Sequence, residues 1–346
     1  MGAARATDAE RVTSMPAPEV VTLGECLVSL IARDRGPLAE SETFVRTVAG
    51  AEANVAVGLA RLGHGVAYVG RVGADALGTV IRRRLRGEGV DIDHLVVDES
   101  GPTGLMIREL RDLGPMEVIY HRAGSAGSRL GPADIEAARG TIERARWLHL
   151  TGITPALSPG AAAALVRAKE LARDAGVTLS LDLNIRRRLW SEADAAPALQ
   201  GLVDGMDLVL GGLDEVALVG GLASTLEHAG RCDPVEAAEA LLAAGARQVV
   251  VKLGAQGALL RDAHGATTSS PALGVARVVD PVGAGDAFTA GYLALTLEGA
   301  PPDRALRAAN VCGALAVSTV GDLTGLPDRA TLDSLLAGPG GPDTIR

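Results

Sequence analysis

The chain has 346 residues, of which 47% are hydrophobic and 22% charged, a balance typical of a globular protein with a substantial core. Its formal net charge of −9 argues against non-specific nucleic-acid binding, which requires a basic surface. No apolar stretch is long enough to span a bilayer, and the three scattered cysteines lack the spacing of a metal site. These features predict a cytoplasmic protein with reduced thiols and no membrane or nucleic-acid partner.

Apolar runs typical of strands alternate along the chain with segments that have the period of amphipathic helices. Strands are expected at residues 20–31, 66–73, 147–153, 177–184, 207–211 and 248–254. Helices are expected at residues 53–63, 74–90, 159–176, 234–246, 286–299 and 302–321, the first of them ended by Gly63 as a left-handed cap. This alternation predicts an α/β fold with a mostly parallel central sheet flanked by helices on both faces.

Two stretches interrupt the alternation, at residues 29–48 and about 95–122. They carry the short β-like segments FVRTV, TGLMIREL and MEVIYHR, with turn signals at Asp34-Arg35-Gly36 and Leu113-Gly114-Pro115. We expect these stretches to form a small β-sheet that covers the main domain as a lid.

The sequence shows no internal repeat and no low-complexity linker, which favours a single domain. We place that domain at residues 19–335, with the lid inserted in it. A disordered N-terminal tail is expected at residues 1–18 and a flexible C-terminal tail at residues 336–346.

The segment VVDPVGAGDAFTAGYLALTLEG, residues 278–299, carries the strongest chemical signal. A β-rich run is expected to end at Asp280-Pro281, and a helix to begin near Asp286. The turn between them consists of small residues, Gly283, Ala284 and Gly285. Small residues let backbone N–H groups approach a phosphate, and the helix N-terminus adds partial positive charge. Asp286 is then placed to accept the proton of an attacking hydroxyl, and the helix N-terminus should favour its ionised form.

Asp286 could be a helix N-cap in an ordinary strand–helix turn. The segment is not a Walker A loop, because the GK[ST] ending is missing, and it is not a Rossmann GxGxxG motif, because Phe288 stands in place of the third glycine.

The wider sequence resembles the ribokinase/PfkB family of sugar kinases. DPVGAGDAFTAG resembles the second family signature, and AGAEANVAVGLARLG at residues 49–63 resembles the first, with Ala49-Gly50 in place of its usual Gly-Gly pair. GRVGADALG at residues 70–78 follows in the family order, and the resemblance covers about residues 20–330. It implies a ribokinase-like core with a β-lid, a catalytic Asp286 beside its glycine turn, and ATP and Mg²⁺ as cofactors. A monovalent cation is left open as a third.

Four further stretches, GECLVSLI, YHRAGSAGSRL, LHLTGITPALS and LDLNIRRRLW, resemble the family branch that phosphorylates 2-keto-3-deoxy sugar acids. The carboxylate of such a substrate needs a cation, best a guanidinium, and Arg122 and Arg186 are the candidates. The resemblance implies that the sugar is bordered by Gly50, Asn54, Met106, Tyr120, Arg122, Ile153, Arg186 and Asp286. Alternatively, Tyr120 belongs to the lid core and Arg186 to a solvated run of three arginines. Met106 replaces a tyrosine frequent in this branch, so a related ketoacid or ketose stays open.

The nucleotide side is less distinctive. By resemblance, Gly254 and Gly257 in VKLGAQGALL permit close approach of the nucleotide, and Asn310 lies near adenine or ribose unless it is a structural helix asparagine. Lys252 is expected to be an edge-strand lysine rather than a phosphate contact. Glu215 remains from the family's Asn-x-x-Glu motif, whose asparagine is here Gly212, and implies Mg²⁺ organised through water.

The function expected from these residues is transfer of a phosphoryl group from ATP to the terminal hydroxyl of a sugar acid. A kinase of a neutral sugar such as fructose or ribose is the first alternative, and a catalytically silent sugar- or nucleotide-binding regulator is the second. The aromatic content of 2% disfavours a nucleoside kinase, and the missing GxGxxG motif disfavours a dehydrogenase. Exposed lid strands would favour a homodimer or a larger homo-oligomer.

Overall fold

The computed structural model describes residues 18–111 and 116–337. Residues 1–17 of the tail expected at 1–18 and residues 338–346 of the tail expected at 336–346 lie outside the described residues, as does the turn signal at Leu113-Gly114-Pro115. None of the helices within the described residues combines the length and the apolar character needed to cross a membrane.

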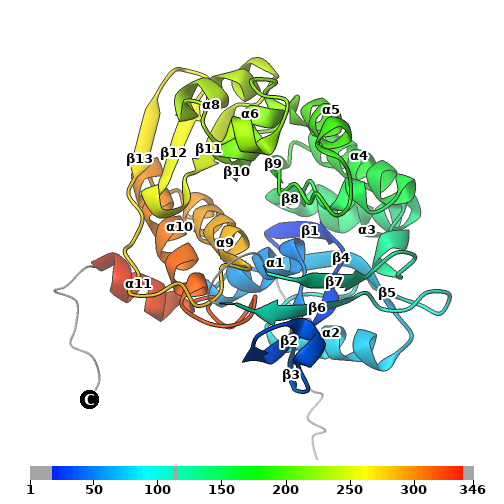
Figure 1. Cartoon of the computed structure of the whole chain (residues 1–346). Helices are drawn as coiled ribbons and strands as arrows, with labels where there is room; N and C mark the ends of the chain where they lie inside the picture. Colours follow the sequence, from blue (N-terminus) through cyan, green and yellow to red (C-terminus); the bar gives the residue numbers. More distant parts are fainter. Residues whose placement is uncertain (1–17, 112–115, 338–346) are drawn as a thin grey trace, which may run out of the picture.

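A nine-stranded sheet forms the centre of the fold, and its strands follow one another along an arc (Figure 1). In spatial order the strands are β13 (Thr267–Ser270), β12 (Ala258–Asp262), β11 (Gln248–Lys252), β10 (Leu208–Gly212), β9 (Thr178–Asp182), β8 (Trp147–Thr151), β1 (Val20–Gly24), β4 (Val66–Gly73) and β5 (Leu95–Asp98). Only the pairs β11–β12 and β12–β13 are antiparallel among these neighbours. The expected α/β fold with a mostly parallel sheet is therefore confirmed.

Helices cover both faces of this sheet, so its strands are buried on both sides. Val20 belongs to one hydrophobic cluster and the next residue, Val21, to the other, as the two-residue period of a strand requires. The first cluster includes side chains from α1 (Ala51–Arg61), α2 (Ala76–Gly87), α9 (Ala284–Leu297), α10 (Pro302–Val317) and α11 (Arg329–Ala337). The second includes side chains from α3 (Pro132–Arg144), α4 (Pro159–Asp174), α5 (Glu192–Val203), α6 (Leu213–Val219), α7 (Leu226–Ala229) and α8 (Pro234–Ala243).

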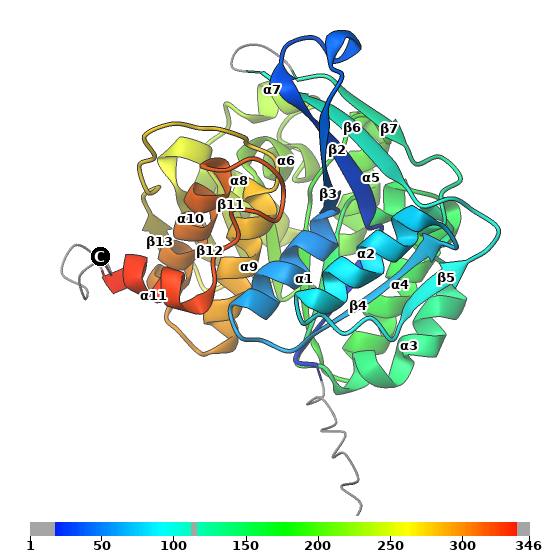
Figure 2. The ribbon, with the colours of Figure 1, turned by 90° about the horizontal axis from the view of Figure 1, so that it is seen from below.

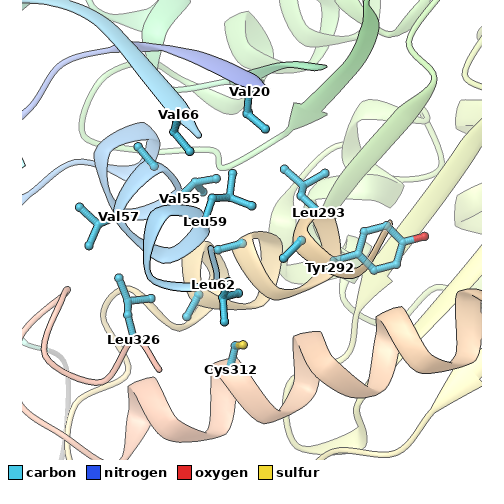
Figure 3. Packing of buried hydrophobic residues seen from close by; sticks show 14 of the residues in the cluster. Val20, Val55, Val57, Leu59, Leu62, Val66, Tyr292, Leu293, Cys312 and Leu326 are labelled. Atoms are coloured by element: carbon cyan, nitrogen blue, oxygen red, sulfur yellow. The ribbon is translucent and has the colours of Figure 1, made fainter. Parts of the chain in front are cut away.

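The contact between α1 and α9 matters most for function. Val55 and Leu59 of α1 face Leu293 of α9 in the first cluster (Figure 3). This packing holds the first signature segment, on α1, against the second, on α9, although more than half of the chain separates them. Gly63 ends α1 with a φ of +96°, as expected for its left-handed cap.

A separate four-stranded sheet, here called the lid sheet, lies on one side of the molecule (Figure 2). Its spatial order is β3 (Phe44–Ala49), β2 (Leu27–Arg35), β6 (Leu105–Leu110) and β7 (Val118–His121). Two details differ from expectation. The strand expected at 20–31 divides at Glu25-Cys26, where the chain leaves the large sheet. Residues 95–98 form β5 of the large sheet, because Leu95 is buried and β5 pairs in parallel with β4.

Several elements escaped the sequence analysis, namely α3, α5, α6, α7, α11, β12 and β13. One expectation next to the glycine turn is wrong: residues 271–280, all of them described, form no strand. The N–H groups of Val279 and Asp280 instead donate to the carbonyl of Val317 at the end of α10. The segment is therefore tied to a helix end rather than to a sheet edge.

Candidate active site

A cleft of about 420 Å³ opens where the carboxyl ends of β9, β10 and β11 meet the N-terminus of α9. Open α/β sheets bind ligands at this edge, because successive loops leave it in different directions. The cleft is lined by charged and small residues, including Asp182, Asn184, Arg186, Glu215, Lys252, Gly283, Gly285 and Asp286. With Tyr120, which also lines the cleft, the structure brings residues from five separate segments of the sequence to one place.

The glycine turn takes the form that a phosphate-binding helix N-terminus requires. Gly283 is the N-cap of α9 and has a φ of +82°, in the left-handed region. A Cβ atom there would lie 3.0 Å from the carbonyl oxygen of Asp322, so the close approach also requires glycine. The N–H group of Ala284 makes a long hydrogen bond of 3.4 Å to the carbonyl oxygen of Pro281. Because first-turn N–H groups have no intrahelical partner, the N–H groups of Gly285 and Asp286 remain donors at the cleft end of α9.

Asp286 lies in the first turn of α9 and is not its N-cap, so the interpretation as a simple cap is wrong. Its side chain is buried and accepts hydrogen bonds from Asn54 Nδ2 at 2.7 Å and Asn184 Nδ2 at 3.3 Å. Burial raises the pKa of Asp286 above its ordinary value, against the lowering effects of Asn54 and Arg186. We expected the helix N-terminus to favour the ionised form, but loss of solvation outweighs it. A raised pKa makes the carboxylate a stronger base.

Asn184 is the second donor to Asp286 and escaped the sequence analysis. It is the only non-glycine residue with a positive φ, +40°, in the described part of the chain. Asparagine tolerates this conformation better than most residues, and here the bend turns its amide from the end of β9 toward α9. The available signal was an asparagine directly after a buried strand, in LDLN.

Replacement of Asn54 by leucine is expected to shift the acid limb of the kcat–pH profile to higher pH. Asn54 stabilises the ionised form of Asp286, so its loss raises the pKa of Asp286 further. The base works when ionised, and a higher pKa means that it becomes protonated sooner as the pH falls. The measurement is kcat across the acidic and neutral pH range for the wild type and the Asn54→Leu variant. An acid limb at the same pH in both proteins would contradict the role of Asp286 as the base.

Lys252 differs from its expected role. It stands at the carboxyl end of β11, which has β10 and β12 on either side, so it is not an edge-strand lysine. Its Nζ donates to Asp182 Oδ2 at 2.6 Å and to the carbonyl oxygen of Gly285 at 3.2 Å. Thr289 also donates to Asp182, at 2.8 Å. This network places an ammonium group in the wall of the cleft, beside the glycine turn.

The residues expected to border the sugar all line one smaller pocket of about 70 Å³, next to the cleft. They are Gly50, Asn54, Met106, Tyr120, Arg122, Ile153, Arg186 and Asp286. The sequence analysis missed further lining residues, among them Glu25, Glu52 and Asp322. Position 50 requires glycine, because a Cβ atom there would lie 2.5 Å from the carbonyl oxygen of Glu25.

The two arginines of the pocket are in different electrostatic situations. Arg122 donates through Nε to Glu25 Oε2 at 2.7 Å, and Nη2 lies 2.5 Å from the same oxygen. Ser125 donates to Glu25 Oε1, so both oxygens of this buried carboxylate accept hydrogen bonds. The side chain of Arg186 forms no hydrogen bond or ion pair with any other described residue, and the residue is exposed at the rim. Arg186 is therefore the arginine of the pocket whose guanidinium is not bound to a carboxylate of the described residues, although its charge acts on Asp286.

Tyr120 belongs to the core of the lid sheet and also lines the pocket. It stands opposite Met106 in the register of β6 and β7 and packs with it in a small hydrophobic cluster of the lid sheet. It also lines the pocket, and the Arg122 guanidinium lies 5.5 Å from its ring centre. The ring therefore supports the arginine by a cation–π contact and forms part of the pocket wall.

Three residues expected on the nucleotide side do not line the cleft or the pocket. Asn310 donates to the carbonyl oxygens of Ser270 and Pro271, both at 3.1 Å, which fits the structural interpretation. Gly257 has a φ of +96°, and a Cβ atom there would lie 2.1 Å from the carbonyl oxygen of Ser270. Gly254 has a φ of +57° in the same connection between β11 and β12. These residues shape the loop that leads away from the cleft.

Glu215 does line the cleft, as the first turn of α6 places it there. Its two oxygens accept from the backbone N–H groups of Ile185 at 2.6 Å and Gly212 at 2.9 Å. Burial, followed by the charge of Asp182, raises the pKa of Glu215 to about 7. Within the described residues no group of three or more His, Cys, Asp or Glu side chains is arranged to hold a metal ion.

Comparisons with known proteins agree with this geometry. The family model described as pfkB family carbohydrate kinase matches residues 17–329. The chain is 37% identical over 324 residues to the 2-dehydro-3-deoxygluconokinase of Bacillus subtilis (strain 168), covering 92% of this chain and 95% of the relative. It is 38% identical over 323 residues to the enzyme of the same name from Thermoproteus tenax, covering 92% and 94%.

Among solved structures, an E. coli protein classed as a ribokinase II, in complex with ATP and Mg²⁺, superposes with a TM-score of 0.82 at 26% identity. The match covers 92% of this chain and 99% of that one. The expected ribokinase-like fold is confirmed, and with it the resemblance drawn from the two signatures. The chain belongs to the pfkB family of carbohydrate kinases.

Proposed function

We propose that the protein is an ATP-dependent sugar-acid kinase. Its reaction transfers the γ-phosphoryl group of Mg·ATP to the terminal hydroxyl of 2-keto-3-deoxygluconate, also named 2-dehydro-3-deoxygluconate, and yields the 6-phosphate. One observation carries the proposal: the guanidinium of Arg186, which has no hydrogen-bonded partner among the described residues, and the buried base Asp286 line the same small pocket. A sugar acid presents a carboxylate and a hydroxyl at opposite ends, which matches this pair. The two relatives at 37% and 38% identity carry the corresponding name.

In this proposal Arg186 binds the substrate carboxylate, because a guanidinium offers it paired donors. Arg122, held in place by Glu25, directs its remaining N–H groups to the sugar. The terminal hydroxyl then lies at Asp286. Its oxygen forms the bond to the γ-phosphorus, the bond from that phosphorus to ADP breaks, and Asp286 takes the proton. The N–H groups of the turn at Gly283, Ala284 and Gly285 stabilise the charge on the transferred group.

The cleft beside this pocket suits a nucleotide and its metal ion. Lys252 and the N-terminus of α9 supply positive charge for phosphates. Mg²⁺ usually keeps several waters and binds through substrate phosphates, so Glu215 would act on it through water. Gly254, Gly257 and Asn310 would act on the nucleotide indirectly, by shaping the loop after β11. A requirement for a monovalent cation stays a prediction.

A neutral-sugar kinase is the second candidate. It is favoured by the apolar walls of the pocket, Met106 and Ile153, and by the neutralisation of Arg122 by Glu25. A silent regulator would have no use for the buried base Asp286 with its two amide donors.

The test is ADP release with Mg·ATP on a panel of substrates: 2-keto-3-deoxygluconate, 2-keto-3-deoxygalactonate, gluconate, fructose and ribose. We expect turnover with the keto-deoxy acids and little with the neutral sugars. Preference for fructose or ribose would keep Asp286 as the base and overturn the role of Arg186. ADP release from none of them would favour the regulator.

A homodimer or larger homo-oligomer is proposed as well, together with a cytoplasmic location. Phe44 and Val45 of β3, the edge strand of the lid sheet, are 38% and 41% exposed. An exposed apolar edge strand is a surface that proteins commonly cover. Light scattering coupled to size exclusion would give the mass in solution, and a monomer would contradict the expectation.

A further inference from the structure

Arg108, on β6 of the lid sheet, is the largest fully buried side chain in the described residues. Its Nη2 donates to Asp280 Oδ2 at 2.5 Å and lies 3.6 Å from Asp322 Oδ1. Both carboxylates are buried as well. A buried ion pair is a poor way to stabilise a fold, because the loss of hydration costs about as much as the attraction returns. Its position therefore calls for an explanation beyond stability.

Asp280 leads directly into the glycine turn. Its Oδ1 accepts from the N–H of Val282 at 3.1 Å, and its Oδ2 accepts from the N–H of Gly321 at 3.0 Å as well as from Arg108. Gly283 in turn packs against the backbone of Asp322. The Asp280 carboxylate thus joins β6 of the lid sheet, the turn before α9 and the segment at Gly321-Asp322 that packs against this turn.

The same strand also reaches the sugar pocket. Met106 lines the pocket, and Arg108 stands two residues further along β6, so both side chains project from the same face of the lid sheet. β6 therefore contacts the active site at two points, one at the sugar and one at the support of the glycine turn.

Charge gives a second reason for an arginine at this point. Burial raises the pKa of Asp322 to about 6, and the charges of Asp286 and Asp280 add to this effect, while Arg108 opposes it. Without Arg108, these carboxylates would face one another uncompensated next to a site that must also accept polyphosphate. A guanidinium can bind both carboxylates at once, whereas an ammonium group is a single point charge.

We propose that Arg108 is a positioning residue for phosphoryl transfer: through Asp280 it couples the lid strand β6 to the backbone donors of the turn at Gly283–Gly285. The inference rests on the proposed function, since those donors act on the transferred group. Displacing the lid strand then displaces the turn, and the rate falls although no residue that touches substrate has changed.

The test compares Arg108→Lys with a matched control, Arg71→Lys. Arg71 also bridges two carboxylates, Asp134 at 2.9 Å and Asp98 at 3.1 Å, and lines neither the cleft nor the pocket. We expect Arg108→Lys to lower kcat by on the order of 10- to 100-fold, the usual effect of misplacing catalytic groups by about 1 Å. KM for the sugar acid should change little, and Arg71→Lys should leave kcat near that of the wild type.

Two further measurements separate positioning from a general loss of stability. Asp280→Asn should lower kcat by itself, and adding Arg108→Lys should lower it little further, because both changes break one connection. Amide hydrogen exchange of the segment 279–287 should be faster in Arg108→Lys and unchanged in Arg71→Lys. This readout needs no turnover, so it decides the inference even if the wild type phosphorylates no sugar acid. Unchanged kcat or exchange in Arg108→Lys, or equal losses in both lysine variants, would overturn it.

Discussion

Replacement of Asp286 by asparagine is expected to lower kcat by at least ~10²-fold, the usual contribution of a general base. The amide has nearly the same shape as the carboxylate but cannot take the proton of the attacking hydroxyl. The fold should tolerate the change. Asn54 Oδ1 is buried and has no hydrogen-bond partner, so a rotated Asn54 amide can accept from the new side chain.

Three measurements check this result: kcat from ADP release, the two KM values and the melting temperature. We expect the melting temperature and the KM values to stay near those of the wild type, because burial disfavours the charge that the substitution removes. A variant that turns over within tenfold of the wild type would show that Asp286 is not the base.

Replacement of Arg186 by glutamine is expected to raise KM for the sugar acid by about 10- to 100-fold, the range of a hydrogen bond between charged groups. The effect on kcat should be smaller, since the carboxylate is remote from the reacting hydroxyl. Arg122 cannot take over, because its guanidinium is already paired with the buried Glu25.

Arg188→Gln is the matched control for this prediction. Arg188 belongs to the same run and also lacks a partner among the described residues, but it lines only the wider cleft of about 890 Å³ outside the sugar pocket. The KM of the Arg188→Gln variant for the sugar acid should stay near that of the wild type. If both variants raise KM for the sugar acid equally, the three arginines at 186–188 act as a diffuse positive surface. The proposed binding of the substrate carboxylate by Arg186 is then wrong.

Much of the fold could be predicted because its signals are local. Buried parallel strands such as β9 and β10 are continuous apolar runs, and long helices such as α4 have a clear period. The missed elements lack such runs. β13 has the sequence TTSS and is a strand only because it pairs with β12, and α6 has only seven residues. Their structure comes from tertiary contacts that no short window of sequence contains.

The candidate site also has features that could be predicted from the sequence and features that could not. Asp286 and the glycine turn were predictable from one short segment with a known chemical logic. The partners that set their properties are far apart in the chain: Asn54 and Asp286 are 232 residues apart, and Arg108 and Asp280 are 172 apart. The raised pKa of Asp286 could not be predicted either, because it depends on burial, which outweighs the helix N-terminus that the sequence reveals.

Transfer of phosphate from ATP to the terminal hydroxyl of a sugar acid is tested most directly by phosphorus NMR of the reaction mixture. With Mg·ATP and 2-keto-3-deoxygluconate, we predict ADP and a new phosphomonoester whose phosphorus couples to the methylene protons of C6. The Asp286→Asn variant should form this signal far more slowly. Release of inorganic phosphate alone, or a phosphoester on another carbon, would contradict the account.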